Sequence, residues 1–187
     1  MKNLVSAVLM FVVATVIFGV IYPLAVTGLA QVFFPEKANG SLIKNDKNEI
    51  IGSKLIGQQF SGAGYFHSRP SAAGNGYDAS ASSGSNLGPT NKKLIDRIYS
   101  DAEKLQSDNP NQTIPVDLVT TSASGLDPHI SLASLEFQIP RVAKERNLSK
   151  TEVRKIAEKF IEDGDFGFFG EPRVNVLMLN LELAKNK

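Results

Sequence analysis

LVSAVLMFVVATVIFGVIYPLAVTGLAQVFF, residues Leu4–Phe34, is the stretch that decides the fold class of this chain. None of its residues is charged, and it exceeds the about 20 apolar residues that cross a bilayer core. A cleaved secretory signal is the alternative, because residues 28–30 offer small side chains at a cleavage spacing. The apolar region of such a signal is only roughly 7–15 residues long. We therefore predict an uncleaved single transmembrane helix at 4–34, after a short tail at 1–3.

A row of small or weakly polar residues runs along this predicted helix. Thr15, Gly19, Pro23 and Thr27 recur every four residues, so they share one face. Such faces let neighbouring transmembrane helices approach closely, and we predict a helix–helix interface here; a lone anchor with chance spacing is the alternative. Pro23 is expected to kink the helix unless neighbouring groups satisfy the carbonyl that it frees. The span holds no Asp, Glu, Lys, Arg or His, so alone it offers no ion pathway.

Lysines flank the predicted span unevenly. Lys2 precedes it, whereas Lys37, Lys44, Lys47 and Lys54 follow it. A simple count under the positive-inside rule places the C-terminal part in the cytoplasm, but the rule loses force for long translocated domains. The residues alone therefore leave the orientation open.

Composition excludes several classes of function. The chain has 20 basic and 19 acidic side chains, and this balance argues against nucleic acid as a partner, because such partners usually need a basic face. There is no Cys, which excludes disulfides and thiolate metal sites. Two His residues and scattered carboxylates form neither a zinc-type nor a calcium-type pattern, so we predict no metal site.

Residues 35–187 are predicted to form one soluble α+β domain. Its clearest element is a helix after Ser149, because Ser149 and Glu152 have the spacing of a capping box. Gly164 is expected to end that helix. The other predicted elements are a hairpin of 41–44 and 49–56, a helix capped by Thr90 or Asn91, a strand at 116–121, a helix from Ser131 that Pro140 interrupts or ends, and a strand at 174–183.

A stretch of mostly Gly, Ser and Ala covers residues 61–91. Such a composition is typical of flexible linkers. However, Phe60, Tyr65, Phe66 and Tyr77 lie in or beside it, and disordered segments contain few aromatic residues. We interpret the stretch as an ordered loop in which Gly permits close backbone approach.

The end of this stretch, residues 83–93, is a candidate for nucleotide contact. It is rich in Gly and runs into a helix N-terminus that carries Lys92 and Lys93, where backbone amides can hold phosphate. It is not a Walker A sequence, because Pro89 follows Gly88, and a capped loop without ligand is the alternative. The candidate residues, for a nucleotide or for an interface, are Gly84, Ser85, Asn86, Gly88, Thr90, Asn91 and Lys92.

The sequence contains no specific catalytic motif. Asp127 and His129 could form a triad with Ser122, Ser124 or His67, but such residues near a turn are common by chance. There is no Gly-x-Ser-x-Gly sequence. We therefore predict a chain without catalytic residues, with a membrane-anchored hydrolase or a small-ligand-binding domain as alternatives.

Five strings in this chain are long and unusual in composition. They are YFHSRPSAAG at 65–74, SGSNLGPTN at 83–91, DLVTTSASGLDPHIS at 117–131, EFQIPRVA at 136–143 and FGEPRVNVL at 169–177. These strings resemble the C subunits of the Kdp high-affinity potassium pump. The resemblance extends over essentially the whole chain, in the order of that family, and includes the N-terminal span.

The resemblance implies a non-catalytic subunit of a bacterial plasma-membrane complex that hydrolyses ATP to import potassium. A channel-like subunit of that complex handles the potassium, a P-type ATPase subunit is phosphorylated, and a further small single-span subunit is expected. The C subunit is described as assembling the complex and as a catalytic chaperone that raises the affinity of the ATPase subunit for ATP.

In this family the soluble domain usually lies outside the cytoplasm, so direct contact with ATP conflicts with the location of ATP. We therefore expect any effect on ATP affinity to pass through the complex. The resemblance also gives the strings a role as contact surfaces, beside the lipid contacts of the span. The predicted interface residues outside the span are Tyr65, His67, Arg69, Asp127 and His129.

Overall fold

The computed structural model describes residues 1–185 of the 187-residue chain. It confirms a mixed α/β chain with one long apolar N-terminal helix. The chain forms two compact units, Met1–Ser53 and a second that begins at Lys54. The soluble domain was predicted at 35–187, and its last two residues lie outside the described residues.

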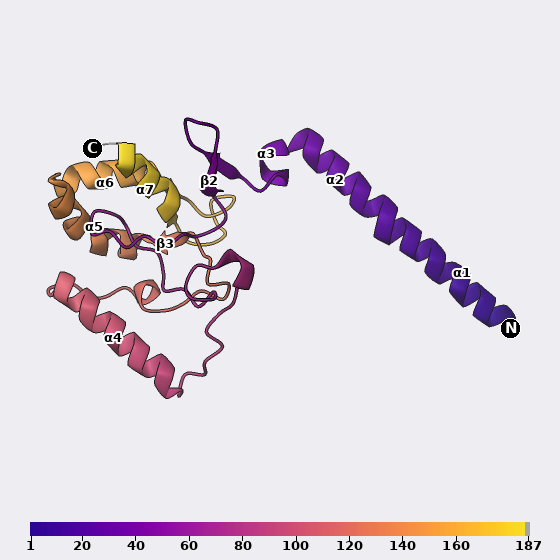
Figure 1. Ribbon diagram of the computed structural model, residues 1–187, viewed down its shortest axis with the longest axis horizontal. Helices are drawn as coiled ribbons and strands as arrows, with labels where there is room; N and C mark the ends of the chain where they lie inside the picture. Colours follow the sequence, from indigo (N-terminus) through magenta and orange to yellow (C-terminus); the bar gives the residue numbers. More distant parts are fainter. Residues whose placement is uncertain (186–187) are drawn as a thin grey trace. The chain divides into compact units, whose positions relative to one another are not determined.

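The first unit begins with a helical rod, coloured indigo in Figure 1. Three helical segments follow one another without a break: α1 (Lys2–Val16), a π-helical turn (Ile17–Ile21) and α2 (Tyr22–Phe33). Together they span Lys2–Phe33, in which an 18-residue window has a mean hydropathy of 2.8 and no buried residue. The rod is therefore long and apolar enough to cross a membrane.

The π-helical turn lies directly before Pro23. Proline has no N–H to donate to the carbonyl four residues earlier, which is that of Gly19. The Tyr22 N–H bonds instead to the carbonyl of Ile17, five residues back. A wider turn thus accommodates the proline, and the helix continues on both sides of it.

A short helix and a hairpin complete the first unit. Helix α3 (Pro35–Ala38) precedes strands β1 (Leu42–Lys44) and β2 (Ile50–Ser53), which pair antiparallel. Asn45 shapes the turn between them, because its Oδ1 accepts hydrogen bonds from the N–H groups of Lys47 and Glu49. The predicted hairpin is confirmed, with a second strand that is shorter than expected.

The second unit is built around a small antiparallel sheet of order β3-β5-β4, formed by β3 (His129–Ser131), β4 (Ile161–Glu162) and β5 (Arg173–Asn175). Helices α5 (Leu132–Arg146), α6 (Lys150–Glu158) and α7 (Val176–Lys185) gather together in Figure 1. Helix α4 (Lys92–Asp108) is a separate rod below them in that view, and short 3₁₀ turns lie at Ala79–Ala81 and Val116–Leu118. The core includes Phe66, Ile130, Ile139, Val142, Val153, Val174, Leu179 and Leu183.

Two predicted helix starts are confirmed by their caps. Ser149 and Glu152 form the capping box of α6, in which each side chain bonds to the backbone N–H of the other residue. Asn91 caps α4 through a hydrogen bond from the Lys93 N–H. Helix α6 ends at Glu158, so Gly164 does not end it as predicted, and Ile161 instead begins β4.

The prediction that Pro140 interrupts the helix from Ser131 is wrong. Helix α5 continues to Arg146 and ends at Asn147, which has the left-handed φ of 56° that asparagine tolerates. The buried side chains of Ile139, Val142 and Ala143 lie on both sides of the proline. Their burial offsets the cost of one missing hydrogen bond.

The two predicted strands at 116–121 and 174–183 are also wrong. The first is a 3₁₀ turn over Val116–Leu118. In the second, β5 ends at Asn175, whose Oδ1 accepts from the Met178 N–H and so caps α7. Leucines at alternate positions suggested a strand, but burial follows the helical spacing of 176, 179, 180 and 183, where position 180 is an asparagine.

Candidate functional site

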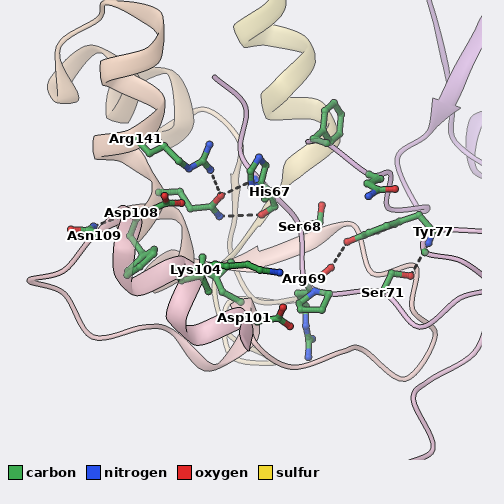
Figure 2. Close-up of a pocket in the computed structure, with 18 of the residues that line it drawn as sticks. His67, Ser68, Arg69, Ser71, Tyr77, Asp101, Lys104, Asp108, Asn109 and Arg141 are labelled. Carbon is green, nitrogen blue, oxygen red and sulfur yellow. Dashed lines mark hydrogen bonds between the residues drawn. The ribbon is translucent and has the colours of Figure 1, made fainter. Parts of the chain in front are cut away.

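A cavity of about 600 Å³ in the second unit lies where the residues after Phe60 approach α4 and α5. Figure 2 shows its walls, with His67, Ser68 and Arg69 on one segment and Asp101, Lys104 and Asp108 on α4. Three rings, of Phe60, Tyr77 and Phe137, add apolar surface. The cavity therefore combines polar and charged groups with aromatic walls, as small-molecule sites do.

Two buried amide side chains hold the segment that carries the cavity wall. Asn180 of α7 accepts from the Phe66 N–H at 2.9 Å and donates to its carbonyl at 2.8 Å. Gln138 of α5 accepts from the His67 N–H at 2.8 Å and donates to its carbonyl at 3.0 Å. These bonds satisfy the backbone of an irregular segment as strand pairing would. The interpretation of this part of 61–91 as an ordered loop is confirmed.

Close backbone contact fixes the next part of the same loop. Gly125 has a φ of 68°, and a Cβ there would lie 2.7 Å from the Ala73 nitrogen and from the Ser83 carbonyl oxygen. The Ser71 hydroxyl donates to the Gly125 carbonyl at 2.6 Å. Only glycine fits this crossing of the 71–83 and 122–127 segments.

Arg69 joins the cavity wall to the Asp127 turn. Its Nη1 lies 3.2 Å from Asp127 Oδ2, and its remaining nitrogens donate to groups of Thr120 and Thr121. Its carbonyl oxygen accepts a hydrogen bond from the hydroxyl of Tyr77, whose pKa is raised by burial. Arg69 is thus held at both its backbone and its guanidinium group.

A chain of charged contacts continues from Arg69 across the sheet. His129 Nδ1 lies 3.5 Å from Asp127 Oδ1, and His129 Nε2 lies 3.3 Å from Glu162 Oε2. Glu162 in turn lies 3.4 Å from Nε of Arg173. Burial raises the pKa of Asp127, but hydrogen bonds from His129 and the charge of Arg69 outweigh it and hold the pKa below its ordinary value.

His67 lies at the other side of the cavity. Its Nε2 is 3.1 Å from the Gly62 carbonyl oxygen. Burial, together with the charge of Arg141, lowers the pKa of this imidazole, so the neutral form is favoured near pH 7. Arg141 donates to the carbonyls of Ala63 and Tyr65 and to Oε1 of Gln138, and Figure 2 shows the last of these bonds.

Two groups in the cavity wall have unused hydrogen-bonding capacity. Figure 2 shows Lys104 extending from α4 toward the segment with Ser68 and Arg69. Its ammonium group forms no ion pair with any residue in the range 1–185. The hydroxyl of Ser68 is buried and, within the same range, forms no well-aligned hydrogen bond, although it lies close enough to the Tyr77 hydroxyl to lower the pKa of that phenol. Both groups could serve an anionic or hydroxyl-bearing ligand.

The candidate triad residues lie in different surroundings. Both nitrogens of His129 face carboxylates, those of Asp127 and Glu162. The hydroxyl oxygens of Ser122 and Ser124 accept from the N–H groups of Gly125 and Leu126, so they shape the turn. No hydrogen bond joins a serine hydroxyl to either histidine in the part of the chain that the structure describes. The absence of catalytic residues stays a prediction.

The candidate nucleotide loop makes contacts within its own chain. Gly84 packs on the backbone of Ala123, where a Cβ would lie 2.9 Å from the carbonyl oxygen. Asn86 has a φ of 51°, and the carbonyl of Gly88 accepts from the Asn91 N–H. Lys92 Nζ lies 2.7 Å from Asp96 on the next turn of α4. These contacts shape a loop that enters a capped helix, and its role toward a nucleotide stays a prediction.

The predicted helix interface lies on the exposed rod of the first unit. Thr15, Gly19, Pro23 and Thr27 are all exposed. A Cβ at Gly19 would lie 3.7 Å from Cγ2 of Thr15, which places these two residues on one face. Contact with a second helix stays a prediction.

Sequence reasoning did not single out Gln138, Asn180, Lys104 or Arg141. Gln138 and Asn180 are 3% and 1% exposed. A signal for them was present, because each is a polar residue at a position that helical spacing assigns to an apolar face. Lys104 and Arg141 gave no such signal, since charged residues on helices usually face solvent.

Comparison with known proteins places the whole chain among potassium-transporting ATPase subunits. The family model described as K+-transporting ATPase, c chain, matches residues 4–185. A protein named potassium-transporting ATPase KdpC subunit from Koribacter versatilis is 59% identical over 97% of this chain and 94% of its own length. Proteins of the same name from Acidobacterium capsulatum and Bradyrhizobium diazoefficiens are 55% and 48% identical, over 98% and 99% of this chain and 98% of each relative.

Proposed function

The chain belongs to the KdpC family, and from this premise we propose that it is a membrane-anchored accessory subunit of an ATP-driven potassium import complex. The observation that carries the proposal is the family match over residues 4–185, which includes the apolar helix. That helix has no charged residue between Asn3 and Pro35, so it offers no ion pathway of its own, and potassium transport and ATP hydrolysis are assigned to partner subunits. The partners are a channel-like subunit, a P-type ATPase subunit and a further small single-span subunit.

Assembly in the bacterial inner membrane is the first part of this function. The helix Lys2–Phe33 anchors the chain, and its exposed row from Thr15 to Thr27 provides a surface for close helix packing. Extraction of the tagged chain in mild detergent should recover the larger subunits. Recovery of the chain alone would contradict the proposal.

The second part is a catalytic chaperone role, in which the chain raises the affinity of the ATPase subunit for ATP. Such an effect is a coupling free energy between two sites and needs no shared ligand. Purified complex should therefore hydrolyse ATP with a higher half-saturating concentration when this subunit is absent. The same half-saturating ATP concentration with and without the subunit, in preparations where the subunit is shown to bind when present, would exclude the chaperone role. The assembly role would then remain.

The orientation determines whether the effect is indirect. We place the second unit outside the cytoplasm, where ATP is absent. Single cysteines at Asn3 and at the exposed Lys150, labelled on intact cells with an impermeant maleimide, test this placement. Labelling at position 150 alone supports the indirect mechanism. Labelling at position 3 alone would place the cavity and the 83–93 loop in the cytoplasm, within reach of ATP.

A second candidate function is small-ligand binding, and the cavity favours it. Lys104, which forms no ion pair within residues 1–185, suits an anion, and the buried Ser68 hydroxyl and the aromatic walls suit an apolar part beside it. A ligand that binds only the folded chain raises its melting temperature. Thermal shifts of the full chain with ATP and with inorganic phosphate, and their loss in Lys104→Ala, would support this function. Shifts that persist in Lys104→Ala but disappear in Lys92→Ala would move the site to the 83–93 loop.

A further inference from the structure

Three phenylalanines are displayed to solvent between β4 and β5. They lie in residues 163–171, which we name the phenylalanine loop. Phe166, Phe168 and Phe169 are 88%, 73% and 59% exposed. The rings of Phe168 and Phe169 contact each other, with centroids 4.3 Å apart and their planes tilted by 40°. An exposed apolar patch of this kind marks a contact surface more often than a patch of isolated residues does.

The loop has a defined shape that presents the rings outward. The Phe169 N–H bonds to the Asp165 carbonyl at 3.0 Å, and the Gly167 N–H bonds to the Gly164 carbonyl at 2.9 Å. A Cβ on Gly164 would lie 2.6 Å from the Phe169 carbonyl oxygen, so the two arms of the loop touch. At the base, Arg173 lies 3.4 Å from Glu162 and 3.8 Å from Asp165. The loop is therefore preorganised and fastened to the sheet.

The backbone of this loop costs folding free energy at Phe166, and the exposed rings contribute little to offset it. Phe166 has a φ of 56°, a left-handed conformation that is unfavourable for a bulky residue. Its ring stays in solvent, although Phe160 and Ile161 nearby pack against the core. Strained backbone of this kind persists mainly at functional positions. The exposed rings gain little from contacts within residues 1–185, which favours a contact with another molecule.

The charges around the loop decide between a lipid and a protein partner. Within residues 162–173, the exposed carboxylates are Glu162, Asp163, Asp165 and Glu171, and Arg173 is the one Lys or Arg, which gives this segment a net charge of −3. Membrane-surface segments instead combine apolar rings with Lys and Arg, which anionic lipids attract. A negative rim is repelled by such lipids. It is complementary to a protein pocket that has a basic rim.

We propose that the phenylalanine loop inserts into an apolar pocket with a basic rim on a larger subunit of the transport complex. The three rings are the buried anchors, and the carboxylates around them pair with the rim. This inference rests on the proposed function, because it takes its partner from the same complex. It adds which surface of the second unit makes the contact.

Photo-crosslinking in the intact complex tests the contact directly. Phe168 is replaced by benzoylphenylalanine in the full chain, expressed with its partner subunits, and the cells are irradiated. We expect an adduct between this chain and one of the two larger co-purifying subunits, the channel-like or the P-type ATPase subunit, with the cross-linked peptide carrying apolar residues and Lys or Arg. Tyr99 is 69% exposed on α4 and is the matched control position; we expect at least about tenfold less of that adduct there.

A triple variant measures the contribution of the rings. In Phe166→Ser/Phe168→Ser/Phe169→Ser we expect about tenfold less recovered partner after detergent extraction, since buried aromatic anchors dominate interfaces. Tyr99→Ser should recover the wild-type amount. The melting temperature of the triple variant should match that of the wild type, because the rings touch the core of the described chain very little.

The outcomes separate this inference from the proposed function. If wild-type chain recovers no ATPase subunit, the proposed function fails first. If it recovers the subunits but residue 168 cross-links only to lipid or only to a second copy of this chain, the proposed docking is overturned and the function stands. Recovery of the partner at the wild-type level by a folded triple variant also overturns it.

Discussion

Two loops of the second unit carry phenylalanine among glycines, and they use it in opposite ways. In the loop after Gly62, Phe66 is completely buried, and amide side chains from two helices bind the backbone on either side of it. In the phenylalanine loop, the rings are exposed, and the backbone hydrogen bonds of residues 164–169 within the described range join residues of the loop itself. Similar compositions thus give a loop that packs into the core in one case and a loop with solvent-exposed rings in the other. The difference lies in partners contributed from elsewhere in the chain, Asn180 and Gln138.

The largest effect on the free energy of unfolding is expected from removing the buried ring of Phe66. Phe66→Ala removes a fully buried ring and leaves a cavity, so it should lower the free energy of unfolding by about 4 kcal/mol. Phe168→Ala, at an exposed position, should change it by less than about 0.5 kcal/mol. Urea titration of the full chain in mild detergent, followed by near-ultraviolet circular dichroism of tyrosine, measures both. Equal effects would remove the distinction between the loops.

The next effect concerns the amide that holds the buried loop. Asn180→Leu leaves the N–H and carbonyl of Phe66 buried without partners, so it should cost about 3 kcal/mol. Gln112→Ala is the control, because Gln112 is exposed and accepts only from Asn109; it should cost less than about 0.5 kcal/mol. Hydrogen exchange at Phe66 should rise strongly in the first variant alone. Retained protection there would show that the amide does not order the loop.

A smaller effect should depend on pH. Burial lowers the pKa of His67 in the folded chain below its unfolded value of about 6.5. This group therefore contributes stability that is complete above about pH 6.5 and is lost as the pH falls through the folded pKa. His67→Gln should lose less stability than the wild type between pH 7 and pH 5, and urea titrations at both values measure this. A steeper loss in the variant would contradict the assigned direction.

The smallest effect should appear in the exposed loop and have the opposite sign. Phe166→Gly relieves a φ of 56° at a ring that is 88% exposed. We expect unfolding to cost about 0.5–1 kcal/mol more in this variant, because glycine adopts such a φ without a steric penalty. Phe168→Gly is the matched control and should bring no gain. A loss of stability in Phe166→Gly would mean that its ring packs against the fold.

Local signals predicted part of this fold correctly. The apolar span, the hairpin turn around Asn45, the cap at Asn91 and the capping box at Ser149 each depend on residues close in sequence. Pro140 was misjudged because its helix is stabilised by packing against distant residues, which no local pattern shows. Helix α7 was predicted as a strand, because the buried Asn180 interrupts the helical pattern of apolar residues.

The candidate site shows the same limit. Arg69, Asp127 and His129 were singled out from strings of sequence, and the structure joins them through contacts across nearly 60 positions. Lys104 and Ser68 became candidates only when the fold placed them on one cavity. Their chemistry depends on neighbours that sequence spacing does not give.

The π-helical turn at Ile17–Ile21 also sets the direction of the small-residue row. In a regular α-helix a spacing of four residues overshoots the 3.6-residue turn by about 40°, so a row of four such positions spirals around the rod. A π turn holds more residues in each rotation, and it therefore winds the row back between Thr15 and Thr27. The wider turn thus offsets part of the rotation that accumulates along the row. The row can then follow one straight neighbouring helix over its whole length.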